Sequence, residues 1–286
     1  MELIESSTTQ TEASVSGSSF YAAMRVLPRA QRLAMFAVYR FCRAVDDVAD
    51  GAGDRRTRFA ELEQWRADVD TLFAGAPSAR VSALHEPVRE FALRREDFLA
   101  IIDGMEMDVT ADIVAPDLAT LDVYCDRVAC AVGRLSVRIF GMQGEDGVSL
   151  AGHLGRALQL TNILRDLDED AVKRRLYLPR EVLRAAGIAT TDPAAVLSDV
   201  ALGRACAAVV SRAAGHFADA RRILSRYPLR IGRAPLMMAK VYENILERLV
   251  ARGWSPPRHA VHAGRARLLW ILLRYGLLSV DRSASH

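Results

Sequence analysis

Three aspartates stand close together in an otherwise apolar segment with helical periodicity. Asp46, Asp47 and Asp50 fall near the end of the stretch 28–50, which contains Val45, Val48 and Ala49 between them. Asp46 and Asp50 are four residues apart, so on a helix they share a face, and both lie at the negative end of the helix dipole. Each effect costs a few tenths to about 1 kcal/mol, with the same unfavourable sign. A cationic ligand is expected to compensate.

A second acidic cluster follows more than a hundred residues later, in the segment 148–170. Here Asn162, Asp166 and Asp170 recur at intervals of four along one face, and Asp168 and Glu169 add charge beside them. The rest of that helix is largely apolar, so the carboxylates again do not contribute to its stability.

Only one arginine accompanies each cluster, Arg43 in the first and Arg165 in the second. Magnesium takes oxygen ligands and is usually held by a few carboxylates together with substrate phosphates. Two facing clusters could therefore hold magnesium against a diphosphate, whose oxygens the arginines would contact. A solvated acidic surface explains either cluster alone, but the pair favours the metal–diphosphate interpretation.

The overall composition excludes several classes of protein. The 286 residues include 38 basic and 35 acidic side chains, for a net charge of +3, and 51% are hydrophobic. Such a chain can bury a core and is not disordered as a whole, and basic residues scattered among acidic ones argue against a nucleic-acid-binding surface. Four cysteines without paired spacing predict free thiols rather than a zinc site or a disulfide framework.

The elements that must position the two clusters are all predicted to be helices. Apolar residues three and four apart recur over nearly the whole chain, and no alternating strand of five or more residues is found. The predicted helices cover 28–50, 54–75, 81–109, 119–142, 148–170, 194–226, 235–252 and 259–280. The breaks between them are short, which predicts one all-α domain over residues 17–286, preceded by a disordered polar tail over 1–16.

At these motifs the sequence resembles the squalene/phytoene synthase family, the head-to-head prenyltransferases. The similarity begins at SSFYAAMRVLPRAQR, continues through AVYRFCRAVDDVAD, and recurs at YCDRVACAVGRLSV and ALQLTNILRDLDEDAVKRRLYLPREVL. The sequence around SGSSFYAAMR, DFLAIIDGMEMDV and YCDRVA is most similar to that of the bacterial family members that serve hopanoid biosynthesis. The resemblance implies a single-domain isoprenoid synthase fold, with helices around a deep central cavity.

The resemblance also implies roles for individual residues. Asp46, Asp47 and Asp50 would form one magnesium-binding motif, and Asn162, Asp166 and Asp170 the other. Tyr39, Arg43, Tyr124 and Arg165 are the implied catalytic residues. The implied substrate-binding residues are Ser19, Phe20, Tyr39, Arg43, Tyr124, Val128, Val132, Gly133, Leu154, Leu158, Gln159, Asn162, Arg165 and Tyr242.

The implied reaction joins two farnesyl diphosphates into presqualene diphosphate with release of diphosphate, and it feeds downstream squalene-forming enzymes. Two or three Mg²⁺ ions would bind with the diphosphate, and NADPH is not expected. The proton lost on cyclopropane closure would pass to released diphosphate or to Tyr124. The alternatives are a phytoene or dehydrosqualene synthase and, in another class, a non-catalytic lipid-binding or assembly protein, against which the intact aspartate motifs argue.

The chain differs from the family's common sequence pattern after Tyr124. Where many relatives read YCYYVAGTVG, this sequence has Asp126, Arg127, Cys130 and Ala131. Cys130 in place of glycine is expected to narrow the cavity near the reacting carbons, and the charged pair Asp126–Arg127 is interpreted as surface. The isolated histidines and the residues around Asp108 are interpreted as structural.

The C-terminal stretch GRARLLWILLRYGLLSV combines arginines with bulky apolar residues. It is too short and too interrupted to span a bilayer. Two interpretations remain, a helix lying at a membrane interface and a last helix packed on the domain, and the second is favoured. The protein is expected to be cytoplasmic, with peripheral contact at the inner face of the membrane as the further hypothesis.

Overall fold

The computed structural model describes residue 24 and the ranges 27–110 and 113–263. Every regular element within these ranges is helical, and the nearest approach to a sheet is an isolated parallel bridge between Val114 and Leu176. This confirms the predicted all-α class. Ser19 and Phe20, the N-terminal tail and the predicted helix 259–280 beyond residue 263 lie outside the described residues.

The helices that follow one another along the chain are α3 (Arg29–Asp50), α4 (Arg55–Phe73), η1 (Ser82–Leu84), α5 (His85–Glu90), α6 (Arg95–Thr110), α7 (Leu118–Cys125), the π-helical turn η2 (Asp126–Cys130), α8 (Ala131–Ile139), α9 (Glu145–Arg165), α10 (Leu167–Val172), α11 (Arg180–Ala185), α12 (Pro193–Ser198), α13 (Leu202–Leu224) and α14 (Leu229–Arg252).

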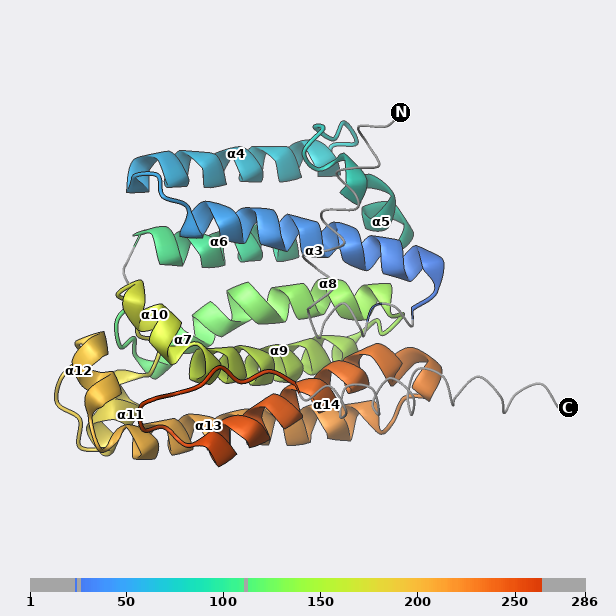
Figure 1. The fold of residues 1–286 in the computed structure, drawn as a ribbon. Coiled ribbons are helices and arrows are strands. Elements are labelled where there is room, and N and C mark those ends of the chain that lie inside the picture. The colour runs from blue at the N-terminus through green and yellow to red at the C-terminus, as the bar shows by residue number, and fades with distance from the viewer. Residues whose placement is uncertain (1–23, 25–26, 111–112, 264–286) are drawn as a thin grey trace, which may run out of the picture.

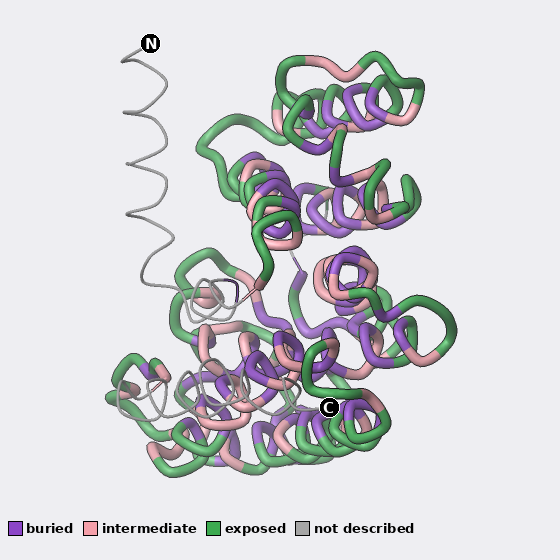
Figure 2. The backbone as a smooth tube through the Cα atoms, turned by 90° about the vertical axis from the view of Figure 1, so that its right-hand side faces the viewer, coloured by how far each residue is buried: buried purple, intermediate pink, exposed green. Residues whose placement is uncertain are grey.

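The long helices lie roughly side by side and form a stack (Figure 1). α4 covers α3 and α6, α8 and α9 form the middle, and α13 and α14 pack beneath α9. Two apolar cores fill the stack, one around α3, α4, α6 and α8 and the other around α9, α13 and α14. Buried residues accordingly line the inner faces of the helices (Figure 2). Val128 of the turn η2 packs against both cores.

Local sequence explains where the first helices begin. α3 starts directly after Pro28, a residue whose fixed φ and missing N–H suit a helix start. The Asp54 side chain caps α4 by accepting a 2.7 Å hydrogen bond from the backbone N–H of Thr57. Both predicted helices, 28–50 and 54–75, are therefore confirmed to within two residues.

Four other predicted helices are interrupted. The stretch 81–109 divides into η1, α5 and α6, and 194–226 divides into α12 and α13. The stretch 119–142 contains the π turn η2, and 148–170 breaks at Asp166 (φ −98°, ψ 13°), where α9 ends and α10 begins. In 119–142 the interruption is a single π turn within an otherwise continuous run of helix, which the periodicity of the sequence does not reveal.

The C-termini of three helices meet at one end of the stack, on the left of Figure 1. α3 ends there at Asp50, α6 at Thr110 and α9 at Arg165. Each C-terminus carries about half a negative charge from its unpaired carbonyls. This end of the molecule is therefore electrostatically suited to cations even before the aspartates are counted.

Candidate active site

A cavity of about 560 Å³ opens at this end of the stack, between α3 and α6 on one side and α9 and α10 on the other. Its volume is in the range typical of small-molecule sites. The lining residues are Tyr39, Cys42, Arg43, Asp46, Asp50, Ile101, Met105, Asp108, Tyr124, Val128, Val132, Gln159, Asn162, Ile163, Arg165, Asp166, Glu169, Asp170, Lys173, Arg175, Tyr177 and Tyr242.

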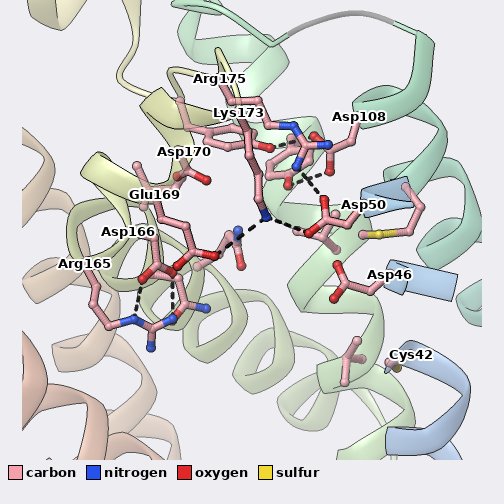
Figure 3. A pocket seen from close by; sticks show the side chains of 18 of the residues that line it. Cys42, Asp46, Asp50, Asp108, Arg165, Asp166, Glu169, Asp170, Lys173 and Arg175 are labelled. Atoms are coloured by element: carbon pink, nitrogen blue, oxygen red, sulfur yellow. Dashed lines mark hydrogen bonds and ion pairs between the residues drawn. The ribbon is translucent and has the colours of Figure 1, made fainter. Parts of the chain in front are cut away.

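Members of both aspartate motifs line this one cavity. Asp46 and Asp50 reach it from α3, while Asn162, Asp166 and Asp170 reach it from the end of α9 and from α10 (Figure 3). The break at Asp166 does not disturb their spacing, because the Asp170 N–H still donates to the Asp166 carbonyl at 2.8 Å. The other predicted residues on the cavity wall are Tyr39, Arg43, Tyr124, Val128, Val132, Gln159, Arg165 and Tyr242.

Four predicted site residues do not reach this wall. Asp47 is exposed, lies 3.0 Å from Arg43, and lines a hollow on the other side of α3. Gly133 packs against α9 so closely that a Cβ would lie 3.1 Å from the Cα of Ala151. Leu154 belongs to the core around α9, and the partly buried Leu158 packs against that core. The structure therefore places these four beside the cavity's walls rather than on them.

Burial and like charge make Asp46 and Asp170 reluctant to ionise. Burial, with the neighbouring Asp166, raises the pKa of Asp170 from 3.8 to about 7. The pKa of Asp46 is likewise raised, by burial and then by Asp50. Both groups would gain from a bound cation, which favours their charged forms.

Asn162 gives an independent test of whether this wall fits a metal ion. Its side-chain Oδ1 is buried and makes no hydrogen bond among the described residues. Leaving such an oxygen unsatisfied costs roughly 1–3 kcal/mol, so a native structure rarely does so without reason. An amide oxygen beside carboxylates is the ligand chemistry that Mg²⁺ prefers, and the residues present fit that ion.

The cavity holds two cations that the sequence argument did not count. Lys173 Nζ lies 2.7 Å from Asp50 Oδ2 and 3.7 Å from Glu169 Oε1, so it spans the two clusters (Figure 3). Arg175 donates to Asp50 Oδ1 at 2.8 Å. Although burial acts the other way, these two hydrogen bonds hold the pKa of Asp50 below its ordinary value. The basic run KRR directly after the second motif was the signal available in the sequence.

The two predicted arginines also lie against the carboxylates. Arg165 donates from Nε and Nη2 to the two oxygens of Asp166, both at 2.7 Å, and Arg43 donates to Asp46 at 2.8 Å. Burial opposes it, but the ion pair with Asp166 raises the pKa of Arg165, which remains charged. Four cations therefore face the cavity in positions from which they could bind a polyanion.

No three His, Cys, Asp or Glu side chains within the described ranges already surround a point where a metal ion could sit. The contacts above give the reason, since Asp50 is paired with Lys173 and Arg175, and Asp166 with Arg165. Metal binding requires these carboxylates to exchange protein cations for the ion. A diphosphate would offer the displaced cations a new anionic partner.

Tyr124 belongs to a buried hydrogen-bonded group on the cavity wall, near the C-terminal end of α6. Its hydroxyl donates to Asp108 Oδ2 at 3.0 Å, and the hydroxyl of Tyr177 donates to Asp108 Oδ1 at 2.7 Å. The two rings stack with their centroids 5.0 Å apart. Burial raises the pKa of the Asp108 carboxyl. Burial and the adjacent Asp108 raise the pKa of the Tyr124 hydroxyl. Asp108 and Tyr177 were not predicted as site residues, because no sequence pattern connects them.

The expectations for Cys130 and the histidines need revision. The Cys130 thiol does not line the cavity; it donates to the carbonyl of Gly152 on α9 at 3.3 Å, so it fills the helix interface instead of narrowing the site. His153 and His216 are not isolated, because their Nδ1 atoms lie 3.1 Å apart across α9 and α13. The four cysteines are free thiols, as predicted.

Comparison with known proteins identifies the class to which this architecture belongs. The sequence profile of the family described as squalene/phytoene synthase matches residues 14–267. The chain belongs to that family, a family of prenyltransferase enzymes.

Individual relatives place the chain more narrowly. It is 59% identical to a presqualene diphosphate synthase of Rhodopseudomonas palustris, covering 92% of this chain and 94% of the relative, and 50% identical to one of Zymomonas mobilis, covering 97% of each. Among solved structures it is similar to squalene synthase HpnC from Alicyclobacillus acidocaldarius, with a TM-score of 0.76 and 30% identity over 83% of this chain and 89% of that one.

Proposed function

We propose that the protein condenses two molecules of farnesyl diphosphate into presqualene diphosphate and releases diphosphate and a proton. The observation that carries the proposal is the placement of both aspartate motifs on one cavity, in a chain 59% identical to a presqualene diphosphate synthase. The product would then serve enzymes that complete the synthesis of squalene.

The polar end of the cavity is suited to the diphosphate groups. Four cationic side chains line it, those of Arg43, Arg165, Lys173 and Arg175. Each can donate hydrogen bonds to diphosphate oxygens. Asp46, Asp50, Asn162, Asp166 and Asp170 would hold two or three Mg²⁺ ions. Bound there, Mg²⁺ would withdraw charge from the leaving diphosphate and so ease breaking of the allylic C–O bond.

The inner end of the cavity is suited to the prenyl chains. Its lining includes the apolar side chains of Ile101, Met105, Val128, Val132 and Ile163. These side chains would exclude water from the reacting carbons. Dryness matters because water would capture the allylic cation left when diphosphate departs. The 2,3 double bond of the second substrate instead attacks C1 of that cation, and proton loss closes the cyclopropane ring.

The environment of Tyr124 bears on the proton acceptor. Its hydroxyl already donates to Asp108, and its pKa is raised, so the phenolate that could act as a base is disfavoured. Released diphosphate carries more negative charge and would lie at the polar end of the same cavity. We therefore propose that diphosphate takes the proton, while Tyr124, held by its hydrogen bond to Asp108, contributes a neutral side chain to the cavity wall.

The test is incubation of the purified protein with farnesyl diphosphate and Mg²⁺, with and without NADPH. The expected product is presqualene diphosphate in both cases, and EDTA should abolish its formation. Squalene appearing whenever NADPH is present would contradict a single-step reaction that needs no nicotinamide cofactor.

A phytoene or dehydrosqualene synthase is the nearest alternative, because those enzymes carry the same motifs. Equal concentrations of farnesyl and geranylgeranyl diphosphate, offered together, distinguish the two. A predominantly C40 product overturns the proposal. A C30 product excludes a phytoene synthase, and it supports the proposal only if it retains a diphosphate, because dehydrosqualene is a C30 hydrocarbon.

Membrane contact is a separate proposal. No helix within the described ranges is long and apolar enough to cross a membrane. Peripheral contact through the stretch 264–280 remains a prediction from its sequence. Flotation with anionic liposomes tests it, with a chain truncated after Ala263 as the control.

A further inference from the structure

The π-helical turn η2 (Asp126–Cys130) carries part of the cavity wall. Tyr124 precedes the turn, Val128 lies within it and Val132 follows it, and all three line the cavity. π-helical turns are rare, because their hydrogen bonding is less favourable than that of an α-helix, and they occur often at functional sites. Contacts from outside the turn must therefore hold it in place.

Two glycines allow neighbouring helices to clamp the turn. A Cβ at Gly104 of α6 would lie 2.6 Å from Val128 Cγ1, and a Cβ at Gly155 of α9 would lie 2.8 Å from Cys130 Cα. Neither helix could approach so closely with any other residue at these positions. The turn is thus packed tightly between α6 and α9, beside the cavity that Val128 lines.

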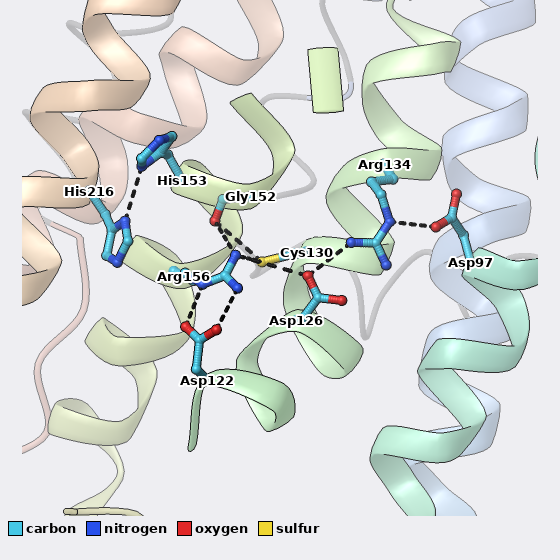
Figure 4. Close-up of polar contacts among 9 residues, drawn as sticks. All are labelled: Asp97, Asp122, Asp126, Cys130, Arg134, Gly152, His153, Arg156 and His216. Atoms are coloured by element: carbon cyan, nitrogen blue, oxygen red, sulfur yellow. Dashed lines mark hydrogen bonds and ion pairs between the residues drawn. The ribbon is translucent and has the colours of Figure 1, made fainter. Parts of the chain in front are cut away.

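A chain of ion pairs through Asp126 links the turn to its neighbouring helices (Figure 4). Asp126 Oδ1 lies 3.0 Å from Arg134 Nη1 and 3.9 Å from Arg156 Nη1. Arg134 also donates to the buried Asp97 of α6 at 2.5 Å, and Arg156 binds both oxygens of Asp122 at 2.7 and 2.8 Å. Asp126 is the only residue of the turn that contacts both arginines in this network.

We propose that Asp126 is a positioning residue, whose contacts with Arg134 and Arg156 hold the π turn so that Tyr124 and Val128 stay against the reacting carbons and water stays out. This inference rests on the proposed prenyl transfer and adds a residue to it. It replaces the interpretation of Asp126 as plain surface. When the turn loosens, water reaches the allylic cation, adds to C1 and loses a proton, which yields farnesol instead of the C30 product.

The variant Asp126→Asn tests this without leaving a buried charge unpaired. Arg134 keeps Asp97 and Arg156 keeps Asp122, so the fold is expected to survive. The matched control is Asp70→Asn, which also breaks an exposed ion pair between elements, that of Arg95 with Asp70, but away from the cavity. Asp126→Glu, which retains the carboxylate, is the conservative rescue.

The main measurement is the ratio of farnesol to presqualene diphosphate formed in H₂¹⁸O, counting only farnesol with ¹⁸O at C1. This label marks water addition to the cation and excludes cleavage at phosphorus, and a ratio does not depend on the amount of folded enzyme. We expect Asp126→Asn to raise the ratio by roughly threefold or more, Asp70→Asn to leave it unchanged, and Asp126→Glu to restore it.

Hydrogen exchange of the free protein gives a second measurement that needs no turnover. Amides of residues 121–135 should exchange faster in Asp126→Asn than in Asp70→Asn, while those of α13 and α14 should not change. An unchanged ratio in Asp126→Asn overturns the proposal even if exchange rises, and so does unchanged exchange. If the wild-type protein makes no presqualene diphosphate, the proposed function fails instead, and exchange alone decides whether Asp126 holds the turn.

Discussion

Lys173 Nζ lies 2.7 Å from Asp50 Oδ2, although the two residues are far apart in the sequence. The lysine follows the second motif and pairs with the last aspartate of the first. A protein cation therefore occupies the gap that a metal ion would need to bridge (Figure 3). Ligand binding at this site would therefore be an exchange of partners.

Removing the lysine should make metal binding easier. In Lys173→Met the carboxylate of Asp50 keeps only Arg175, so the free protein should be less stable, and Mg²⁺ alone should raise its Tm by more than it raises that of the wild type. Thermal unfolding with and without Mg²⁺ measures the difference. The control is the other lysine of the chain, in Lys240→Met, whose ion pair with Glu243 lies on α14. Equal Mg²⁺ shifts in all three proteins would contradict the prediction.

The stability of the metal-free protein should depend on pH through Asp170. The pKa is about 7 in the folded protein and near 3.8 when unfolded, so the folded state binds more protons between these values. The free energy of unfolding must then fall as pH rises, by about 2 kcal/mol between pH 5 and pH 8 from this group. Urea unfolding in EDTA at several pH values measures it.

Two variants isolate that effect. Asp170→Asn should flatten the fall between pH 5 and pH 8. Asp168→Asn should not, because Arg258 holds the pKa of Asp168 below its ordinary value and that group stays ionised throughout this range. A slope that survives Asp170→Asn would assign the titration to another group.

The first motif should not be functionally uniform. Asp46 lines the cavity, whereas Asp47 faces a hollow on the other side of α3. Asp46→Asn is expected to lower kcat/KM by roughly a hundredfold or more, and Asp47→Asn by less than about tenfold. Steady-state kinetics checks this, and circular dichroism checks that both variants keep their helices. Equal losses would show that Asp47 turns into the cavity when substrate binds.

The hydrogen bonds to Asp108 should stabilise the fold as well as orient Tyr124. Tyr124→Phe leaves one buried oxygen of Asp108 without its donor, and we expect unfolding to become easier by about 1–3 kcal/mol. Tyr227→Phe is the control, because that tyrosine makes a longer, 3.3 Å bond to the exposed Asp146 and should change stability by less than about 0.5 kcal/mol. Urea unfolding of both variants at pH 7 gives the comparison.

The sequence by itself determined the helical class, the extent of the first helices and the two faces that carry the aspartates. Helical periodicity fixes which side chains share a face of one helix, and Asn162, Asp166 and Asp170 do share one in the structure. The sequence around these motifs was also enough to identify the family, whose profile covers residues 14–267.

Only the tertiary structure decided which groups face one another across the cavity. Periodicity says nothing about a partner on another helix, so the pairing of Asp50 with Lys173 and of Asp108 with Tyr177 could not be predicted. The same holds for Asp126, whose neighbours in sequence suggest a surface charge, while its ion pairs depend on how α8 and α9 pack around the π turn. Contacts between distant residues arise from packing, and packing is decided by the whole chain at once.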